Sequence, residues 1–163
     1  MVLAVMFWEV VLAVHIAAIV IAFGVTFAYP VMYAVGLKSE QRTMPGFHRI
    51  QDVVGKFVIS PFLALALICG IYLASHLEQW SAFYVQWGLG AILVLGALGG
   101  AFFAPRERKL GELAERDVAA AGDGEVTFSA EYLALRKQVA TVGYLAAALV
   151  LVTIYFMTVH TGA

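Results

Sequence analysis

Four histidines are the residues of this chain best suited to bind a metal ion or a haem. His15 lies about eight residues into an apolar stretch that begins at Phe7, so a helix there would place its ring about 12 Å below the end. An ionisable side chain at that depth in a membrane span is costly, which makes His15 a candidate functional residue. Neutral imidazole binds haem iron, copper or zinc. A structural histidine would instead hydrogen-bond to another helix, with Thr153 as the predicted partner, and both interpretations stay open.

The helical neighbours of His15 favour a cofactor beside it. They form a small and partly polar stripe on one side of the predicted helix: Ala18, Ala22, Thr26 and Tyr29. We expect this stripe to face the other helices, while larger apolar side chains face lipid. A haem b would be held by His15 alone, or by His15 with Met157 or Tyr155 as a weaker second ligand.

The other three histidines offer weaker sites. His76 and His160 lie near the outer ends of two different apolar stretches, where Glu9 or Glu78 would complete a surface copper or zinc site. His48 lies on the opposite side and is predicted to be a residue of the membrane interface. These residues give at most one further metal site, separate from His15.

The elements that position these residues are predicted to be four membrane-spanning helices. Of the 163 residues, 63% are hydrophobic and 13% are charged, whereas soluble domains are about 45–50% apolar and about 25% charged. Four stretches each reach the ~20 apolar residues that cross a bilayer: residues 7–29, 53–75, 83–104 and 139–160. Lipid offers the backbone no hydrogen bonds, so we expect helices. The prediction is an all-α chain with one membrane domain over residues 1–163, an antiparallel four-helix bundle.

The distribution of positive charge predicts the orientation. All ten Lys and Arg residues fall in two segments, Lys38–Lys56 and Arg106–Lys137. By the positive-inside rule, the connections 36–52 and 105–138 are cytoplasmic, and both termini lie on the outer side of the cell (inner) membrane. The lipid bilayer is the predicted partner, because basic segments are attracted to anionic lipid. The net charge of −1 gives no sign of nucleic-acid binding.

Glycines are expected to shape both the spans and their connections. The third stretch contains Gly96-x-x-x-Gly100, which lets helices approach closely within the bundle, or between chains of a homo-oligomer or a larger membrane complex. In the last connection, Gly122 and Gly124 are predicted to end one helix and Ser129 to cap the next. Acids and bases alternate there, so we expect a solvated face rather than a binding patch.

Three stretches carry a resemblance to known membrane proteins: HIAAIVIAFGVTFAYPVMY from His15, SPFLALALICGIYL from Ser60 and the ending IYFMTVHTG. The first two resemble the first two spans of a superfamily of small bacterial membrane proteins, which includes the haem-binding protoporphyrinogen oxidase and the copper-resistance D-type membrane domain. The ending is more similar to a related bacterial family of predicted four-helix integral membrane proteins with no assigned function. The resemblance implies a four-helix bundle, with His15 in the position of the oxidase family's first-span haem ligand.

The resemblance does not extend to the oxidase chemistry. The oxidase family carries a lysine and histidines in its third span, whereas YVQWGLGAILVLGALGG has neither, and the Asn-Glu of its fourth span is missing from TVGYLAAAL. Two functions stay open: a haem- or metal-binding membrane protein that uses His15, and a non-catalytic membrane subunit or assembly factor that acts through helix–helix contacts. No catalytic residue is assigned, and a non-enzymatic role is favoured, because the motifs of hydrolases and nucleotide-dependent enzymes are missing.

Overall fold

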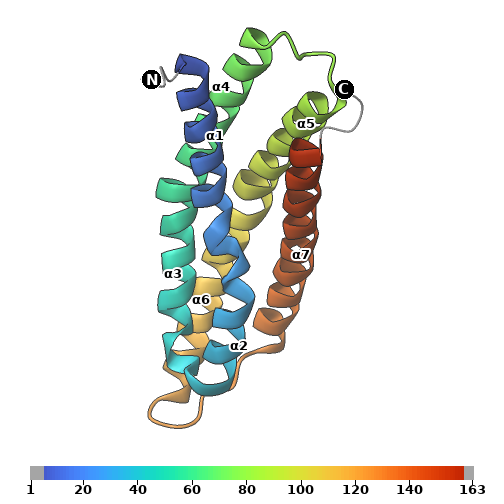
Figure 1. Ribbon diagram of the computed structural model, residues 1–163. Coiled ribbons are helices and arrows are strands. Elements are labelled where there is room, and N and C mark those ends of the chain that lie inside the picture. Colours follow the sequence, from blue (N-terminus) through green and yellow to red (C-terminus); the bar gives the residue numbers. More distant parts are fainter. Residues whose placement is uncertain (1–5, 160–163) are drawn as a thin grey trace.

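The computed structural model describes residues 6–159, and every regular element in that range is a helix. The helices form four long runs along the chain (Figure 1). The bounds, in chain order, are α1 Phe7–Gly24 and α2 Tyr29–Ser39, then α3 Met44–Val54 and α4 Ser60–His76, then α5 Phe83–Ala97 and α6 Ala104–Ala121, and finally α7 Ala130–Val159. Each run is long and apolar enough to cross a membrane. The first three runs contain the first three predicted spans, and the fourth run contains the last predicted span as far as residue 159.

Prolines mark the places where the first three runs depart from regular α-helix. Pro30 lies in the first turn of α2, directly after a 3₁₀ turn at Val25–Phe27. Pro61 and Pro105 follow π-helical turns at Gly55–Ile59 and Leu98–Phe103. A proline has no N–H to donate and its ring presses on the carbonyl one turn earlier, so the preceding turn adjusts. The runs are therefore long helices with local adjustments, and no loop interrupts them there.

The helices pack as neighbouring pairs. The first run lies against the second through α1 and α4, the second against the third through α3 and α6, and α7 packs against α5 and α6. Small side chains lie where helices meet: Ala18, Ala22 and Ala66 are at most 1% exposed. Close packing of small residues is what brings helices together in a membrane, because lipid gives apolar side chains no reason to cluster.

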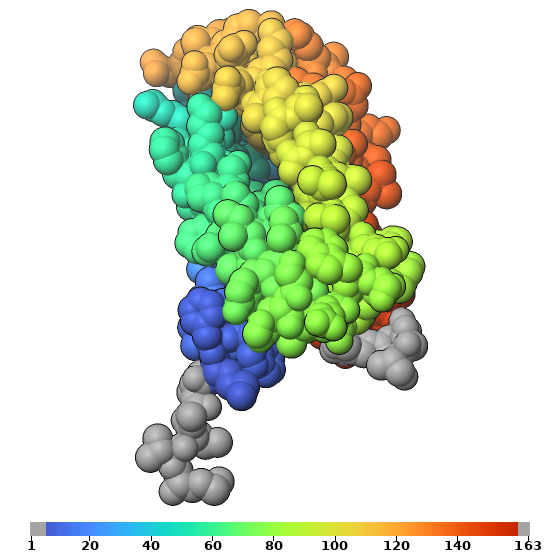
Figure 2. All heavy atoms as spheres, turned by 90° about the horizontal axis from the view of Figure 1, so that it is seen from above, coloured from blue at the N-terminus to red at the C-terminus, as the bar shows by residue number. Residues whose placement is uncertain are grey.

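The best-packed core lies at one end of the molecule. We call this the polar end and define it as residues 33–52 and 105–138, which lie outside the predicted spans. Its core consists of Met44, Phe47, Leu110, Leu113, Ala114 and Tyr132, joined by Val139. Figure 2 shows the α4 and α5 ends, in green, lying away from the α6–α7 connection in orange.

The predicted helix boundaries in the last connection are confirmed. Helix α6 ends at Ala121, and Gly122 follows with a φ of 53°, which favours glycine. The Ser129 hydroxyl accepts a hydrogen bond from the Tyr132 backbone N–H at 3.3 Å and so caps α7. These two local signals fix where the chain turns back into its last helix.

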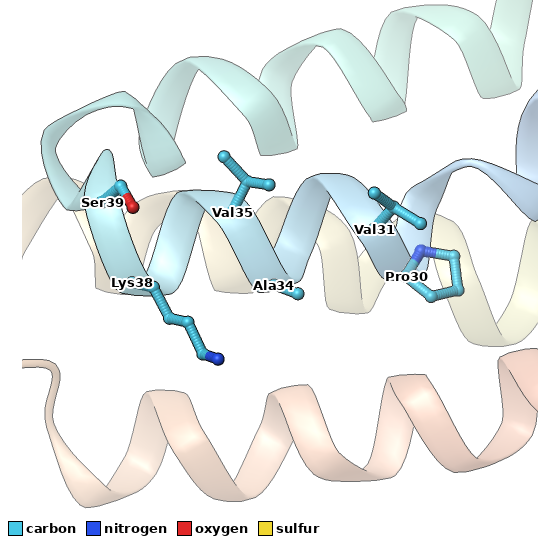
Figure 3. Close-up of a pocket in the computed structure, with 6 residues that line it drawn as sticks. All are labelled: Pro30, Val31, Ala34, Val35, Lys38 and Ser39. Carbon is cyan, nitrogen blue, oxygen red and sulfur yellow. The ribbon is translucent and has the colours of Figure 1, made fainter.

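Two shallow grooves with similar linings run along helices near the polar end. The α2 groove, of about 450 Å³, is lined by Pro30, Val31, Ala34, Val35, Lys38 and Ser39 (Figure 3). The α7 groove, of about 500 Å³, is lined by Phe102, Ala134, Lys137, Gln138, Thr141 and Val142. Each groove combines a mostly apolar wall with a single lysine.

Candidate functional site

His15 is held against the neighbouring helix α4 by a hydrogen bond. Its Nδ1 atom lies 2.8 Å from the carbonyl oxygen of Ala66. A carbonyl oxygen only accepts, so Nδ1 carries the proton, and in the neutral ring the lone pair is on Nε2. Within the described part of the chain, Nε2 makes no hydrogen bond. The ring is thus oriented through Nδ1, and Nε2 carries the lone pair of the neutral form.

A glycine makes room for this ring. Gly70 lies one turn after Ala66 in α4, and a Cβ atom there would be 3.2 Å from Cε1 of His15, which is tighter than an ordinary contact. On α1 itself, Ala18 and Ala22 are buried on the predicted stripe, whereas Val20 on the other side is 63% exposed. The prediction that the small-residue stripe faces the other helices is confirmed for Ala18 and Ala22, whereas Thr26 and Tyr29 are half-buried.

The predicted partner of His15 is wrong. The Thr153 hydroxyl accepts a hydrogen bond from Trp87 Nε1 at 3.1 Å and donates one to the Leu149 carbonyl at 2.8 Å. Both contacts lie within the α5–α7 pair, whereas His15 lies on the α1–α4 pair. The periodicity of two helices does not reveal which side of the bundle each residue faces, and this is why the pairing could not be predicted.

The proposed second haem ligands also lie on α7, away from α4. The Met157 side chain packs against Gly88 of α5. Tyr155 is 55% exposed, and its ring contacts Phe156 at 5.7 Å between centroids. No described contact joins either residue to His15.

The weaker metal site at the ends of the spans is not assembled by the described residues. His76 stacks on Tyr72 with 5.6 Å between ring centroids, and the Glu9 carboxylate accepts the Met6 backbone N–H at 2.8 Å. His160 lies outside the described residues. Within residues 6–159, no group of three or more His, Cys, Asp or Glu side chains is arranged to hold a metal ion.

The two glycines of the predicted packing motif, Gly96 and Gly100, do not pack against the same helix. A Cβ atom on Gly96 would lie 3.6 Å from Leu63 of α4, an ordinary contact inside the molecule, whereas one on Gly100 would have open space around it. Gly96 therefore serves the α4–α5 contact. Gly100, which lies in the π-helical turn after α5, is free of that contact.

A second polar site, which the sequence did not predict, lies buried at the polar end. His48 is 1% exposed, so the prediction of an interfacial residue is wrong. Its Nδ1 atom lies 2.8 Å from a Glu107 carboxylate oxygen, and its Nε2 atom lies 3.0 Å from the Tyr132 hydroxyl. The Tyr33 hydroxyl lies 3.2 Å from the same Glu107 oxygen and 3.1 Å from the Gln51 side-chain oxygen. We call these five residues the buried polar cluster.

The buried polar cluster takes side chains from every helical run. Tyr33 comes from α2, His48 and Gln51 from α3, Glu107 from α6 and Tyr132 from α7. Burial raises the pKa of Tyr132 well above its ordinary value, although Arg136 opposes the shift, so its phenol stays protonated. The Tyr132 hydroxyl can therefore donate to Nε2 of His48, and Nδ1–H of His48 can donate to a Glu107 side-chain oxygen.

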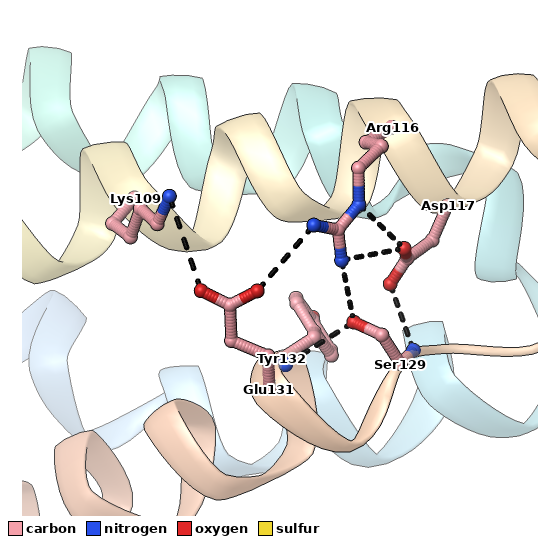
Figure 4. Close-up of polar contacts among 6 residues, drawn as sticks. All are labelled: Lys109, Arg116, Asp117, Ser129, Glu131 and Tyr132. Atoms are coloured by element: carbon pink, nitrogen blue, oxygen red, sulfur yellow. Dashed lines mark hydrogen bonds and ion pairs between the residues drawn. The ribbon is translucent and has the colours of Figure 1, made fainter.

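Ion pairs and hydrogen bonds join α6 to the start of α7 (Figure 4). Asp117 accepts the Ser129 backbone N–H at 2.8 Å and contacts the Arg116 guanidinium at 3.2 Å. Arg116 also reaches Glu131 at 3.4 Å, and Lys109 reaches Glu131 at 4.0 Å. Desolvation alone would raise the pKa of Asp117, but the hydrogen bonds from Ser129 and Arg116 hold that pKa below its ordinary value.

A helical pattern in α3 could have revealed the buried cluster. Met44, Phe47, His48 and Gln51 follow the spacing of one helix face, and all four are buried. Two of these positions are polar, and this obscures the apolar periodicity in a segment that otherwise looks like a charged loop.

Searches against family models, curated proteins and solved structures found no match to this chain.

Proposed function

We propose that this chain is a multi-pass protein of the bacterial inner membrane whose first-span histidine, His15, binds a b-type haem. The membrane part rests on four long apolar runs whose large side chains stay on the surface; Ile16, Ile68 and Leu145 are all more than half exposed. A water-soluble protein rarely exposes so much apolar surface. The four runs would form an antiparallel bundle, with both termini outside.

The orientation follows from where the cations lie. The helices that carry them, α2, α3, α6 and the start of α7, gather at one end of the fold (Figure 1). The positive-inside rule assigns that end to the cytoplasm. The test is labelling of Ser81→Cys in a Cys69→Ala background, which should react with a membrane-impermeant maleimide added to intact cells. Labelling only after the cells are opened would reverse the proposed topology.

The haem proposal depends on the hydrogen bond between His15 Nδ1 and the Ala66 carbonyl. Histidines that bind metals usually donate the other ring N–H to a carbonyl or carboxylate, which fixes the tautomer and makes the ligating nitrogen more basic. The Ala66 carbonyl would orient the ring, Gly70 would leave space for it, and Nε2 would hold the haem iron. A bound haem supplies one-electron redox chemistry.

The visible absorption spectrum of the purified protein tests this proposal. Protein expressed with added haem should show a Soret band, and His15→Ala should abolish the band while helix content and gel-filtration behaviour stay unchanged. His76→Ala, a histidine at the end of α4, is the matched control and should keep the band. A colourless wild-type protein after haem supplementation would overturn the proposal.

The second candidate function is then a non-catalytic membrane subunit. For such a subunit, crosslinking in native membranes should recover a stoichiometric partner.

A further inference from the structure

We infer that the α2 groove and the α7 groove are binding sites for acidic phospholipids, with Lys38 and Lys137 holding the lipid phosphates. The inference rests on the membrane location proposed above and is independent of haem binding. Both lysines lie near the polar end, and both grooves extend from there toward the apolar part of their helix. The position, lining and charge of each groove carry the argument.

The shape of the grooves fits a lipid at the membrane boundary. Pro30 and Lys38 lie at opposite ends of the α2 groove (Figure 3), and the helical rise separates them by about 12 Å. In the α7 groove, Ala134 and Val142 are separated by the same rise. Each groove can thus hold the first part of an acyl chain, while its lysine reaches the headgroup level.

The ammonium groups of Lys38 and Lys137 differ from those of the other lysines in their ion pairing within the described part of the chain. Lys56 pairs with Asp52 at 3.4 Å, and Lys109 with Glu131 at 4.0 Å. Neither Lys38 nor Lys137 has an ion pair or a side-chain hydrogen bond with any residue between positions 6 and 159. Two unpaired ammonium groups, each beside an apolar groove, complement a ligand with an anionic head and an apolar tail.

Each groove also offers a polar neighbour for the same phosphate. Ser39 follows Lys38, and Gln138 follows Lys137, and both line their grooves. A hydroxyl or amide N–H beside an ammonium allows a phosphate to accept two hydrogen bonds, one of them charge-assisted. A zwitterionic lipid lacks the net charge that makes this pairing favourable, so we expect selectivity for the acidic lipid.

Photo-crosslinking of the full-length protein tests the inference. The protein is reconstituted in phosphatidylcholine vesicles that contain a trace of phosphatidylglycerol with a diazirine in its acyl chain, and adducts are mapped by mass spectrometry. We expect adducts on both grooves. Lys38→Gln should reduce those on α2 about fivefold and leave those on α7 unchanged, and Lys137→Gln should do the reverse. Fivefold corresponds to about 1 kcal/mol, the usual contribution of one lysine to binding an anionic lipid.

Lys56→Gln is the matched control, because it removes the same charge from a lysine that is already paired with Asp52. It should leave both sets of adducts unchanged. Equal labelling by a phosphatidylcholine probe, or an equal loss in all three variants, would overturn the inference. Those results would leave the membrane topology intact, because Ser81→Cys labelling and the Soret band are measured separately.

Discussion

The ring of His15 has only one free nitrogen because the other is bound to Ala66, and the space around the ring depends on Gly70. Adding one methyl group at position 70 would place a carbon 3.2 Å from the ring, so the ring must shift. We expect Gly70→Ala to lower the haem content at least twofold and to destabilise the protein by about 1–3 kcal/mol, the usual cost of overpacking. Soret absorbance per protein and the thermal midpoint are the measurements.

Gly90→Ala serves as the control for this substitution. It adds the same methyl group to another membrane helix, at a glycine with open space around it. The control should keep both haem and stability. Equal haem content in the two variants would show that the position of the His15 ring does not matter for binding.

Tyr132 allows a test of the buried polar cluster at a single atom. Tyr132→Phe removes the hydroxyl that lies 3.0 Å from His48 Nε2 and leaves that buried nitrogen without its partner. The expected loss of stability is about 1–3 kcal/mol. Tyr144→Phe removes an equivalent hydroxyl from a residue that is 62% exposed on the same helix, and it should change stability by less than about 0.5 kcal/mol. Thermal unfolding in detergent compares the two, and equal midpoints would mean that the hydrogen bond contributes nothing.

At the scale of the elements, Asp117 connects the end of α6 to the beginning of α7. Its pKa is lower in the folded protein than in the unfolded chain, so its contribution to stability is complete above the unfolded value of about 3.9 and disappears as pH falls through the folded value. We expect the wild type to lose stability below about pH 4, and Asp117→Asn to lose less over the same range. Denaturant midpoints measured from pH 6 to pH 2 give the comparison.

Asp123→Asn controls for the general effect of removing one acid. Asp123 is exposed in the connection after α6, so this variant should show the same dependence on pH as the wild type. If Asp117→Asn also follows the wild type at every pH, the contact with Ser129 does not stabilise the helix junction.

The long helices could be predicted from hydropathy, because a span must be continuous and apolar, and all four runs are present. The cap at Ser129 could be predicted as well, since it depends on residues close in the sequence. The spacing of Met44, Phe47, His48 and Gln51 on one helix face indicates the burial of His48, but its partners could not be predicted. Glu107 and Tyr132 lie 59 and 84 residues away in the sequence, and the periodicity of one helix carries no information about such distant contacts.

At the scale of the whole molecule, His48 is the residue on which all four runs converge, because it contacts Tyr33 of α2, Glu107 of α6 and Tyr132 of α7. Removing Glu107 leaves the buried Nδ1 of His48 without its acceptor, which costs about 1–3 kcal/mol. We expect Glu107→Ala to speed hydrogen exchange in α2, α3, α6 and the start of α7 together. Glu112→Ala, at an exposed position of α6, should affect only its own surroundings. Faster exchange confined to α6 in both variants would show that the cluster does not couple the runs.

The composition of the buried polar cluster also determines when it can form. A chain is synthesised from its N-terminus, and His48 and Glu107 are made well before Tyr132, which completes their hydrogen bonds from the start of α7. Until the last helix arrives, His48 Nε2 lacks its protein partner. The hydrogen bonds of the buried polar cluster are therefore complete only once α7 has joined the first three helical runs.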